Sequence, residues 1–470
     1  MKLPRLMIAG SGSGCGKTTI TCGLLRLLQR KGLRPSSFKC GPDYIDPLYH
    51  REVLGINSRN LDSFFSSESQ LRENLCRGFR NGDIAVIEGV MGYYDGLGMT
   101  TRTSCAEIAD LTHTPVLLVL DAAGRSSSVL AELQGFLNYR EEGRWIAGVI
   151  FNRLSPMLYE DLASEAAAMG VKPCGYLKRD DSHRFESRHL GLTLPEERDD
   201  FQEEVDTLAD RLAQTIDMEA VISLAKTAED IEEQTGDSLA GDNIKIRTGS
   251  MPAAGSAAAA PRIALARDAA FCFYYTENTE YLESLGCRII PFSPLRDTRI
   301  PDCDGLILSG GYPELYARQL SENRPMLESV RKAVLAGLPT IAECGGYLCL
   351  HEELTDADGN RYPMAGVIPA KCHFAGFQRQ FGYVTMTTLR DGVFGKEGTS
   401  CRGHEFHYYV SDSHRQDVLC EKPDGRRKWR GGMVNDSLYA GFTHLWLPSG
   451  PEAVRGFVNA CRKGRNLWND

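Results

Sequence analysis

The chain has 470 residues, of which 42% are hydrophobic and 24% are charged. This composition is typical of globular proteins and excludes a disordered or fibrous chain. A net charge of −9 argues against nucleic acid as a partner. The sequence has no apolar stretch long enough for a membrane helix and no recognisable signal peptide, so we expect a cytoplasmic protein without a membrane partner. Its fifteen cysteines include no C-x-x-C pair, which argues against the usual zinc and redox motifs.

Continuous apolar runs alternate with helical patterns in the first half of the chain. The runs cover residues 6–9, 84–87, 116–120 and 146–151. They are unbroken rather than alternating, as expected for parallel strands that are buried on both faces. The clearest helix follows the first run. The pattern predicts a doubly wound α/β domain over residues 1–226.

Composition changes at about residue 227, and residues 227–261 become rich in Gly, Ser and Ala. We expect an interdomain linker here, poorly ordered in its middle. The α/β rhythm then restarts and predicts a second α/β domain over residues 262–470. Its expected strands cover residues 263–266, 289–292, 306–308 and 339–342, followed by short β-like segments between 364 and 441.

The first predicted strand ends in a glycine-rich loop that leads directly into a helix. The loop contains Gly10, Ser11, Gly12, Ser13, Gly14, Cys15, Gly16, Lys17, Thr18 and Thr19. Strand, loop and helix in this order are the context of a P-loop, in which backbone amides cradle phosphates, the lysine reaches the β- and γ-phosphates and the threonine binds Mg²⁺. Gly10 makes the loop one residue longer than the standard pattern. The loop predicts a nucleotide and magnesium site.

Four acidic residues lie at a strand end or in turns near this loop. Glu88 ends a predicted strand, where such folds hold Mg²⁺, and Asp95 follows in the next turn. Asp43 and Asp46 lie in a loop that also contains proline. Acidic residues in loops are usually solvated, but their shared position at this end of the predicted sheet indicates a metal and substrate site.

One cysteine of the second half, Cys344, lies between a buried strand and a probable helix. A helix N-terminus lowers the pKa of a thiol, so we expect a better nucleophile at this position. The amides of Gly345 and of Gly311, which follows another strand, are candidates for binding an oxyanion.

A cysteine nucleophile needs a base, and the candidates are His404, His407 and His444. Spacing alone does not choose among them. His351 lies close to the nucleophile helix in the sequence, and we expect it to cap or pack.

These motifs resemble those of the cobyrinate a,c-diamide synthase family over nearly the whole chain. The matching segments are residues 39–47, 88–96, 148–153, 188–192, 266–271, 310–315, 342–346 and 402–407. The family joins an ATP-dependent amide ligase domain, similar to dethiobiotin synthetase, to a class I glutamine amidotransferase domain with a flavodoxin-like fold. The resemblance implies ATP and Mg²⁺, with L-glutamine and a tetrapyrrole carboxylate as substrates. A homodimer is only the commonest default.

The resemblance also implies roles for individual residues. It selects His444 as the base of Cys344, although Trp446 replaces a second histidine of the family pattern. His404 and His407 are expected to shape the domain interface or the substrate cleft. The remaining implied roles are nucleotide binding by Asn152, metal binding by Thr18, Asp43 and Glu88, and acceptor binding or catalysis by Lys17, Lys39, Tyr44, Asp46 and Asp95.

Two alternatives remain at this stage. One is a family member that amidates sirohaem, sirohydrochlorin or its nickel complex, which the segment from Phe381 and the change at Trp446 favour. The other is a non-catalytic P-loop switch with a degenerate second domain used for docking. The intact surroundings of Cys344 argue against the switch, because a docking module needs no nucleophile.

Overall fold

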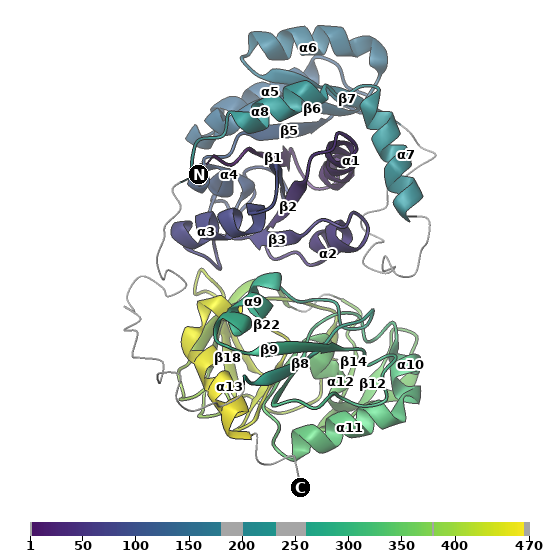
Figure 1. The fold of residues 1–470 in the computed structure, drawn as a ribbon, viewed down its shortest axis with the longest axis vertical. Coiled ribbons are helices and arrows are strands. Elements are labelled where there is room, and N and C mark those ends of the chain that lie inside the picture. The colour runs from purple at the N-terminus through teal and green to yellow at the C-terminus, as the bar shows by residue number, and fades with distance from the viewer. Residues whose placement is uncertain (1, 180–200, 232–259, 378–379, 465–470) are drawn as a thin grey trace. The chain divides into compact units, whose positions relative to one another are not determined.

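The computed structural model describes residues 2–179, 201–231, 260–377 and 380–464 (Figure 1). The chain divides into two compact units, Met1–Ser238 and Leu239–Asp470. Residues 232–259 of the predicted linker lie outside the described residues, as does the matching segment 188–192. The exact domain limits therefore stay a prediction.

A seven-stranded sheet forms the centre of the first unit, with the order β3-β2-β4-β1-β5-β6-β7. All neighbouring strands are parallel, as the unbroken apolar runs predict. The strands are β1 (Arg5–Gly10), β2 (Pro35–Cys40), β3 (Ser58–Leu61), β4 (Ile84–Glu88), β5 (Val116–Asp121), β6 (Ile146–Leu154) and β7 (Lys172–Lys178).

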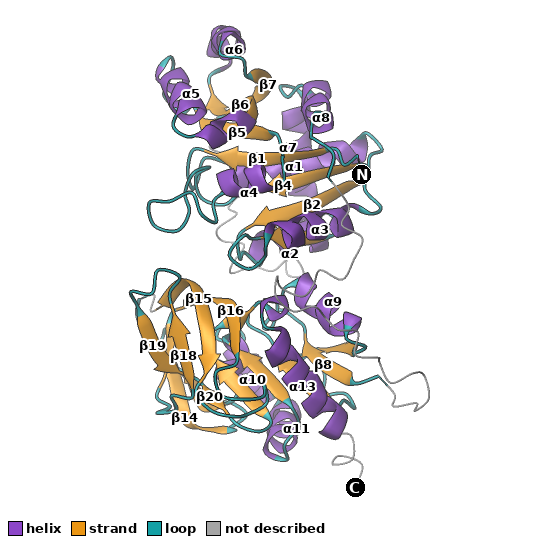
Figure 2. Ribbon diagram, turned by 90° about the vertical axis from the view of Figure 1, so that its left-hand side faces the viewer, coloured by secondary structure: helices purple, strands orange, loops and turns teal. Residues whose placement is uncertain are grey.

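Helices cover both faces of this sheet (Figure 2). They are α1 (Lys17–Arg30), α2 (Ile45–Glu52), α3 (Glu68–Phe79), α4 (Cys105–Leu111), α5 (Ser128–Asn138), α6 (Tyr159–Ala168), α7 (Phe201–Ala213) and α8 (Met218–Lys226). Successive residues of β1 point to opposite faces: Leu6 and Ile8 pack with α1, α2, α7 and α8, whereas Met7 and Ala9 pack with α3, α4, α5 and α6. Both faces are therefore apolar, and polar groups gather at the sheet's end.

The parallel arrangement places the carboxyl ends of the strands at one edge of the sheet. Glu88 at the end of β4 pairs in register with Ile8 of β1 on one side and with Lys39 of β2 on the other. The glycine-rich loop follows β1 at the same edge. Ligands of open α/β sheets bind outside this edge.

The second unit has a six-stranded sheet with the order β20-β21-β11-β10-β8-β9. Five strands are parallel and β20 is antiparallel. The strands are β8 (Arg262–Ala266), β9 (Arg288–Phe292), β10 (Gly305–Leu308), β11 (Thr340–Glu343), β20 (Met433–Val434) and β21 (Leu438–Gly441). The helices of this unit are α9 (Thr276–Ser284), α10 (Ala317–Glu322), α11 (Arg324–Leu335), α12 (Gly345–Cys349) and α13 (Pro451–Gly464).

Two further sheets account for the β-rich stretch predicted between residues 364 and 441. The four-stranded sheet contains β13 (Arg361–Pro363), β12 (His351–Thr355), β14 (Ile368–Phe374) and β17 (Tyr409–Ser411), in that order. The five-stranded sheet contains β19 (Lys428–Gly431), β18 (Val418–Glu421), β15 (Gln380–Thr388), β16 (Ser400–His407) and β22 (His444–Leu445). Each fold prediction of an α/β unit is confirmed.

All fifteen cysteines are buried and none forms a disulfide, which agrees with the absence of paired spacings in the sequence. Every helix within the described residues is too short or too polar to cross a lipid bilayer.

Candidate active sites

The glycine-rich loop after β1 has the geometry of a phosphate cradle. Gly14 and Gly16 adopt positive φ angles of 78° and 101°, a conformation that residues with a Cβ rarely adopt. Lys17 Nζ donates to the carbonyl oxygens of Gly12 at 2.8 Å and Met91 at 2.6 Å. The ammonium group is therefore held over the loop, at the N-terminus of α1.

The end of β6 braces this loop from the side. Asn152 Nδ2 donates to the carbonyl oxygen of Cys15 at 2.8 Å, and the same amide group fills the space where a side chain at Gly16 would lie. Arg153 pairs with Asp121, with Nε 2.8 Å from Oδ1, and donates to the Gly14 carbonyl at 3.3 Å. The structure thus gives Asn152 a contact with the loop itself; its predicted contact with a nucleotide stays a prediction.

A buried ion cluster lies beside the loop and is centred on Glu88. Glu88 Oε1 accepts a hydrogen bond from Thr18 Oγ1 at 2.6 Å and one from Lys39 Nζ at 3.0 Å. Lys39 also contacts Asp46 and donates to the Gly89 carbonyl at 3.1 Å. Thr18, Lys39, Asp46 and Glu88, which come from four different elements, therefore meet at one point.

The charges of this cluster compensate for its burial. Burial alone would raise the pKa of Glu88, but the charge of Lys39 and the contact with His50 outweigh it and hold the pKa below its usual range. Burial acts to lower the pKa of Lys39, whereas Asp46 and Glu88 raise it well above its ordinary value. Burial and the charge of Glu88 raise the pKa of Asp46. Lys39 and Glu88 therefore persist as an ion pair in the interior.

The other two predicted acidic residues, Asp43 and Asp95, differ in their relation to the cluster. Asp43 Oδ2 is 3.9 Å from Lys39 Nζ, and its Oδ1 accepts the Ile45 amide at 2.8 Å. Asp95 is exposed, and its Oδ2 accepts the Gly92 amide at 2.7 Å. Asp95 therefore stabilises the turn that follows β4 and does not join the cluster.

The expectation that Asp46 lies in a loop is wrong. Asp46 is a buried residue in the first turn of α2, with Pro47 after it. Proline is well tolerated in the first turn of a helix, where its missing amide hydrogen loses no intrahelical bond. Tyr44, the residue before this helix, is half-buried.

The donor set at Glu88 suits Mg²⁺, which prefers oxygen ligands and keeps a few protein ligands alongside phosphate oxygens. Thr18 and Glu88 supply a hydroxyl and a carboxylate that already touch each other. Among the described residues, no three His, Cys, Asp or Glu side chains form a metal site by themselves. A metal here would therefore depend on Thr18 and on the phosphates of a nucleotide.

Sequence reasoning missed His50, which is completely buried in α2. His50 Nε2 lies 3.2 Å from Glu88 Oε2, and Nδ1 is 2.7 Å from Ser37 Oγ. The imidazole therefore lies against the second carboxylate oxygen of Glu88, while Thr18 and Lys39 donate to the first. A signal was present in the sequence, because Asp46 and His50 are four residues apart and share a helix face.

In the second unit, Cys344 forms a sharp turn between β11 and α12. It has φ 46° and ψ −101°, a conformation that is strained for a residue with a side chain. Gly346 makes the turn possible, since a Cβ there would lie 2.7 Å from Leu308 Cβ and would also collide with the Leu308 carbonyl. This is the predicted elbow.

Three contacts, made by His444 and by residues close to it in the sequence, place it beside the elbow. The Cys344 amide donates to the Gly441 carbonyl at the end of β21 at 2.8 Å, and the chain reaches His444 three residues later. Leu445, the residue after His444, donates to Oε1 of Glu343, the residue before Cys344, at 3.1 Å. The imidazole packs on Gly310 at the end of β10, where a Cβ would lie 2.9 Å from Nδ1. Cys344 and His444 therefore occupy the same edge of the sheet.

The expectation of a lowered thiol pKa is wrong. Burial raises the pKa of Cys344 well above its ordinary value, and α12 is only five residues long, so its N-terminus does not offset the loss of water. Burial also lowers the pKa of His444 to about 3. The site therefore holds a neutral thiol and a neutral imidazole, and a neutral thiol needs a base that accepts its proton before it can act as a nucleophile.

The two glycines predicted to bind an oxyanion face each other beside Cys344. A Cβ on Gly345 would lie 3.1 Å from the amide nitrogen of Gly311. Gly311 itself lies against Ala270, whose carbonyl would collide with any side chain there. Both positions therefore require glycine, and the two backbones lie close together, as an oxyanion site formed by their amides would require.

The other histidines divide into structural and undecided ones. His351 is buried, with Nδ1 2.8 Å from the Tyr347 carbonyl and Nε2 2.6 Å from Ser411 Oγ, so the expectation that it caps or packs is confirmed. His404 pairs with His444 across β16 and β22, and burial lowers its pKa to about 3. His407 stacks on Phe442 with ring centroids 3.9 Å apart.

We predict that His50→Phe destabilises the first domain by about 3 kcal/mol, because the buried Glu88 carboxylate loses a partner that water cannot replace. Differential scanning calorimetry of the full chain measures this as a lower midpoint for one thermal transition. The same variant should bind nucleotide more weakly in a fluorescence titration, since Glu88 also holds Thr18.

His113→Phe is the matched control for His50→Phe. His113 is partly exposed and stacks on Trp145, and its ring nitrogens contact Glu229 at 2.9 Å and Arg72 at 3.3 Å. Phenylalanine preserves the stacking and loses only these contacts near the surface. Its substitution should change the free energy of unfolding by less than about 1 kcal/mol. Equal effects of the two variants would contradict the role given to His50.

A second prediction concerns the pH dependence of stability. Burial raises the pKa of Glu343 to about 8, above its unfolded value, so Glu343 favours folding at low pH and loses that contribution as pH rises towards 8. Between pH 6 and pH 8 the wild-type chain should lose roughly 2–3 kcal/mol through this group. Glu343→Gln keeps an oxygen for the Leu445 amide and should remove most of that loss, as measured by urea unfolding at each pH. A pH dependence as steep in Glu343→Gln as in the wild type would contradict this.

Comparison with known proteins assigns both units. Residues 6–192 match the family model of the CobQ/CobB/MinD/ParA nucleotide binding domain, and residues 262–451 match that of the CobB/CobQ-like glutamine amidotransferase domain. Similar chains include the cobyrinate a,c-diamide synthases of Caldanaerobacter subterraneus subsp. tengcongensis (37% identity, 97% of this chain and 98% of that one) and Priestia megaterium (37%, 99% and 99%). The enzyme of that name from Salmonella typhimurium is 36% identical over 97% of this chain and 98% of its own. The chain therefore belongs to the cobyrinate a,c-diamide synthase family.

Proposed function

We propose that this glutamine-dependent amide-forming ligase amidates the a and c acetate carboxylates of cobyrinate, using ATP and L-glutamine. The family match over both units supports an enzyme with a nucleotide-binding domain and a glutamine amidotransferase domain. The observation that carries the proposal is the presence, in one chain, of a complete phosphate loop and of a cysteine elbow with an adjacent histidine. A non-catalytic switch would need neither the elbow nor the apposed glycines.

The first domain would activate the acceptor carboxylate. In this step a carboxylate oxygen attacks the γ-phosphorus of ATP and the bond from that phosphorus to the β,γ-bridging oxygen breaks. The products are ADP and an acyl phosphate. The loop from Gly10 to Thr19 would bind the phosphates through its amides, and Lys17 would stabilise charge on the transferred group. Lys39, Tyr44, Asp46 and Asp95 are proposed for the acceptor side of this site.

Mg²⁺ would neutralise phosphate charge when bound, and Thr18, Asp43 and Glu88 are its proposed ligands. The protein's contribution to metal binding is to keep the Glu88 carboxylate ionised and in a fixed orientation. Lys39 does this by donating to Oε1, the oxygen that Thr18 also contacts, while His50 lies beside Oε2.

The second domain would release ammonia from glutamine. The Cys344 sulfur attacks the amide carbon and its proton passes to His444, which then protonates the leaving ammonia. A thioester of glutamate remains, and water hydrolyses it to glutamate and the free thiol. The amides of Gly311 and Gly345 would hold the oxyanion that forms in both steps. The ammonia then displaces phosphate from the acyl phosphate and forms the amide.

The test is the conversion of cobyrinate by the wild-type chain and by Cys344→Ser, each with ATP and either glutamine or ammonium, followed by mass spectrometry. The wild type should form the diamide from both nitrogen sources. Cys344→Ser should form it from ammonium at a rate within about threefold of wild type but lose activity with glutamine by at least about a thousandfold, because only the glutaminase needs the thiol.

Cys349→Ser is the matched control, because Cys349 is a buried cysteine of the same helix and should keep activity with both nitrogen sources. Loss of both activities together in a folded Cys344→Ser chain would contradict the two-site account. Parallel incubations with sirohaem and with sirohydrochlorin, with and without nickel, test the substrate. Amidation of one of these in place of cobyrinate would overturn the proposed acceptor.

A further inference from the structure

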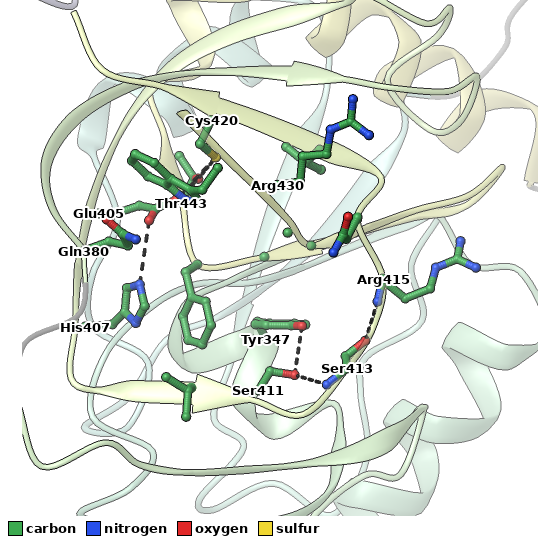
Figure 3. Close-up of a pocket in the computed structure, with 18 of the residues that line it drawn as sticks. Tyr347, Gln380, Glu405, His407, Ser411, Ser413, Arg415, Cys420, Arg430 and Thr443 are labelled. Carbon is green, nitrogen blue, oxygen red and sulfur yellow. Dashed lines mark hydrogen bonds and ion pairs between the residues drawn. The ribbon is translucent and has the colours of Figure 1, made fainter. Parts of the chain in front are cut away.

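A cavity of about 280 Å³ lies in the second unit, between the five-stranded sheet and β17 (Figure 3). Its walls include Glu405 and His407 of β16, Thr443 before β22, and Tyr347 of α12. The volume accommodates a small amino acid but not a tetrapyrrole macrocycle. The size of the cavity and the polar side chains in its walls therefore suit a small polar ligand.

Glu405 gives this cavity its chemical character. Its side chain is buried, with the residue only 2% exposed, and Oε1 accepts hydrogen bonds from Thr443 Oγ1 at 2.6 Å and from Cys420 Sγ at 3.4 Å. Oε2 has no hydrogen-bond partner; its neighbour is His407 Nε2 at 3.7 Å, which is an ion-pair partner only if the imidazole is protonated (Figure 3). A buried carboxyl oxygen without a donor is costly, so Oε2 marks the place of a ligand donor.

The cavity adjoins the segments that hold Cys344 and His444. Tyr347 is one helical turn from Cys344, and Gly441, whose carbonyl accepts the Cys344 amide at 2.8 Å, also lines the cavity. Thr443 immediately precedes His444. The cavity therefore lies beside the segments that carry Cys344 and His444.

We propose that this cavity binds the α-amino-acid end of glutamine and that Glu405 Oε2 accepts a hydrogen bond from its α-ammonium group. This inference rests on the proposed glutaminase activity of Cys344. An ammonium group is a cation with three donors, so it meets both the charge and the missing donor at Oε2. The hydroxyl group of Ser413 on the facing wall offers a donor to the α-carboxylate (Figure 3).

The opposite assignment, with the α-carboxylate at Glu405, would bring two negative groups together in a site that excludes water. Arg415 does not favour it either, because its guanidinium donates to Asp417 at 2.9 Å and 2.6 Å. The geometry therefore makes Glu405 a specificity residue that distinguishes an amino acid from a simple amide.

The test compares glutamine with glutaramate, which is glutamine without the α-amino group. Glutaminase activity of the full chain is measured with each substrate for the wild type and for Glu405→Gln, which keeps an oxygen for Thr443. The wild type should prefer glutamine by at least about a hundredfold in kcat/KM, and Glu405→Gln should reduce this preference by at least about tenfold, mainly through a higher KM for glutamine.

Glu421→Gln, in strand β18 of the same sheet, is the matched control, because Glu421 pairs with Lys428 at 3.0 Å and does not line the cavity. It should keep the wild-type preference. Cobyrinate amidation with ammonium separates this inference from the proposed function, because Glu405→Gln should leave that activity unchanged.

Three outcomes would overturn the inference. One is a wild-type chain that hydrolyses glutaramate as well as glutamine, a result that does not depend on any variant. Another is a Glu405→Gln chain with an unchanged preference. The third is a loss of activity by the same factor with both substrates, which would show a purely structural role for Glu405.

Discussion

The carboxylate of Glu88 is completely buried, and the first domain is arranged around the compensation of its charge. Thr18 from the phosphate loop, Lys39 from β2 and His50 from α2 all contact it. Leaving such a charge without partners in the interior would cost several kcal/mol. The order of the sheet, with β4 between β1 and β2, is what allows the three partners to reach one side chain.

In the second domain, burial favours the neutral forms of the buried side chains instead of being offset by opposite charges. Cys344, His444 and Glu343 are buried, and burial moves their pKa values towards the neutral forms. A neutral pair suits a reaction in which a proton passes from thiol to imidazole only when the substrate is present. The first site thus contains ionised side chains before a phosphate ligand binds. In the second site, the thiol and imidazole become charged only when the proton is transferred.

Local patterns in the sequence were enough to predict the backbone of both sites. The phosphate loop, the strands that precede Glu88 and Cys344, and the glycines at the elbow were all correctly placed, because strand, turn and helix signals act over a few residues. Family resemblance, rather than spacing, selected His444 among three histidines.

The contacts that decide protonation and binding were not predictable in the same way. His50 meets Glu88 across 38 positions of the chain, and Glu405 faces a cavity built from several separate elements. The prediction of a lowered thiol pKa was wrong because a helix N-terminus is visible in the sequence, whereas the burial around Cys344 is not. Asp46 was placed in a loop because the helix that contains it begins only one residue earlier.

The central claim is that the nitrogen of the product amide is released from glutamine at Cys344. The most direct measurement uses glutamine labelled with heavy nitrogen at its side-chain amide, without added ammonium, for the wild type and for Cys344→Ser. Mass spectrometry of the amidated tetrapyrrole then reports the nitrogen source. The account predicts a wild-type product that carries the heavy isotope and no labelled product from Cys344→Ser. A labelled product formed by Cys344→Ser at the wild-type rate would contradict it.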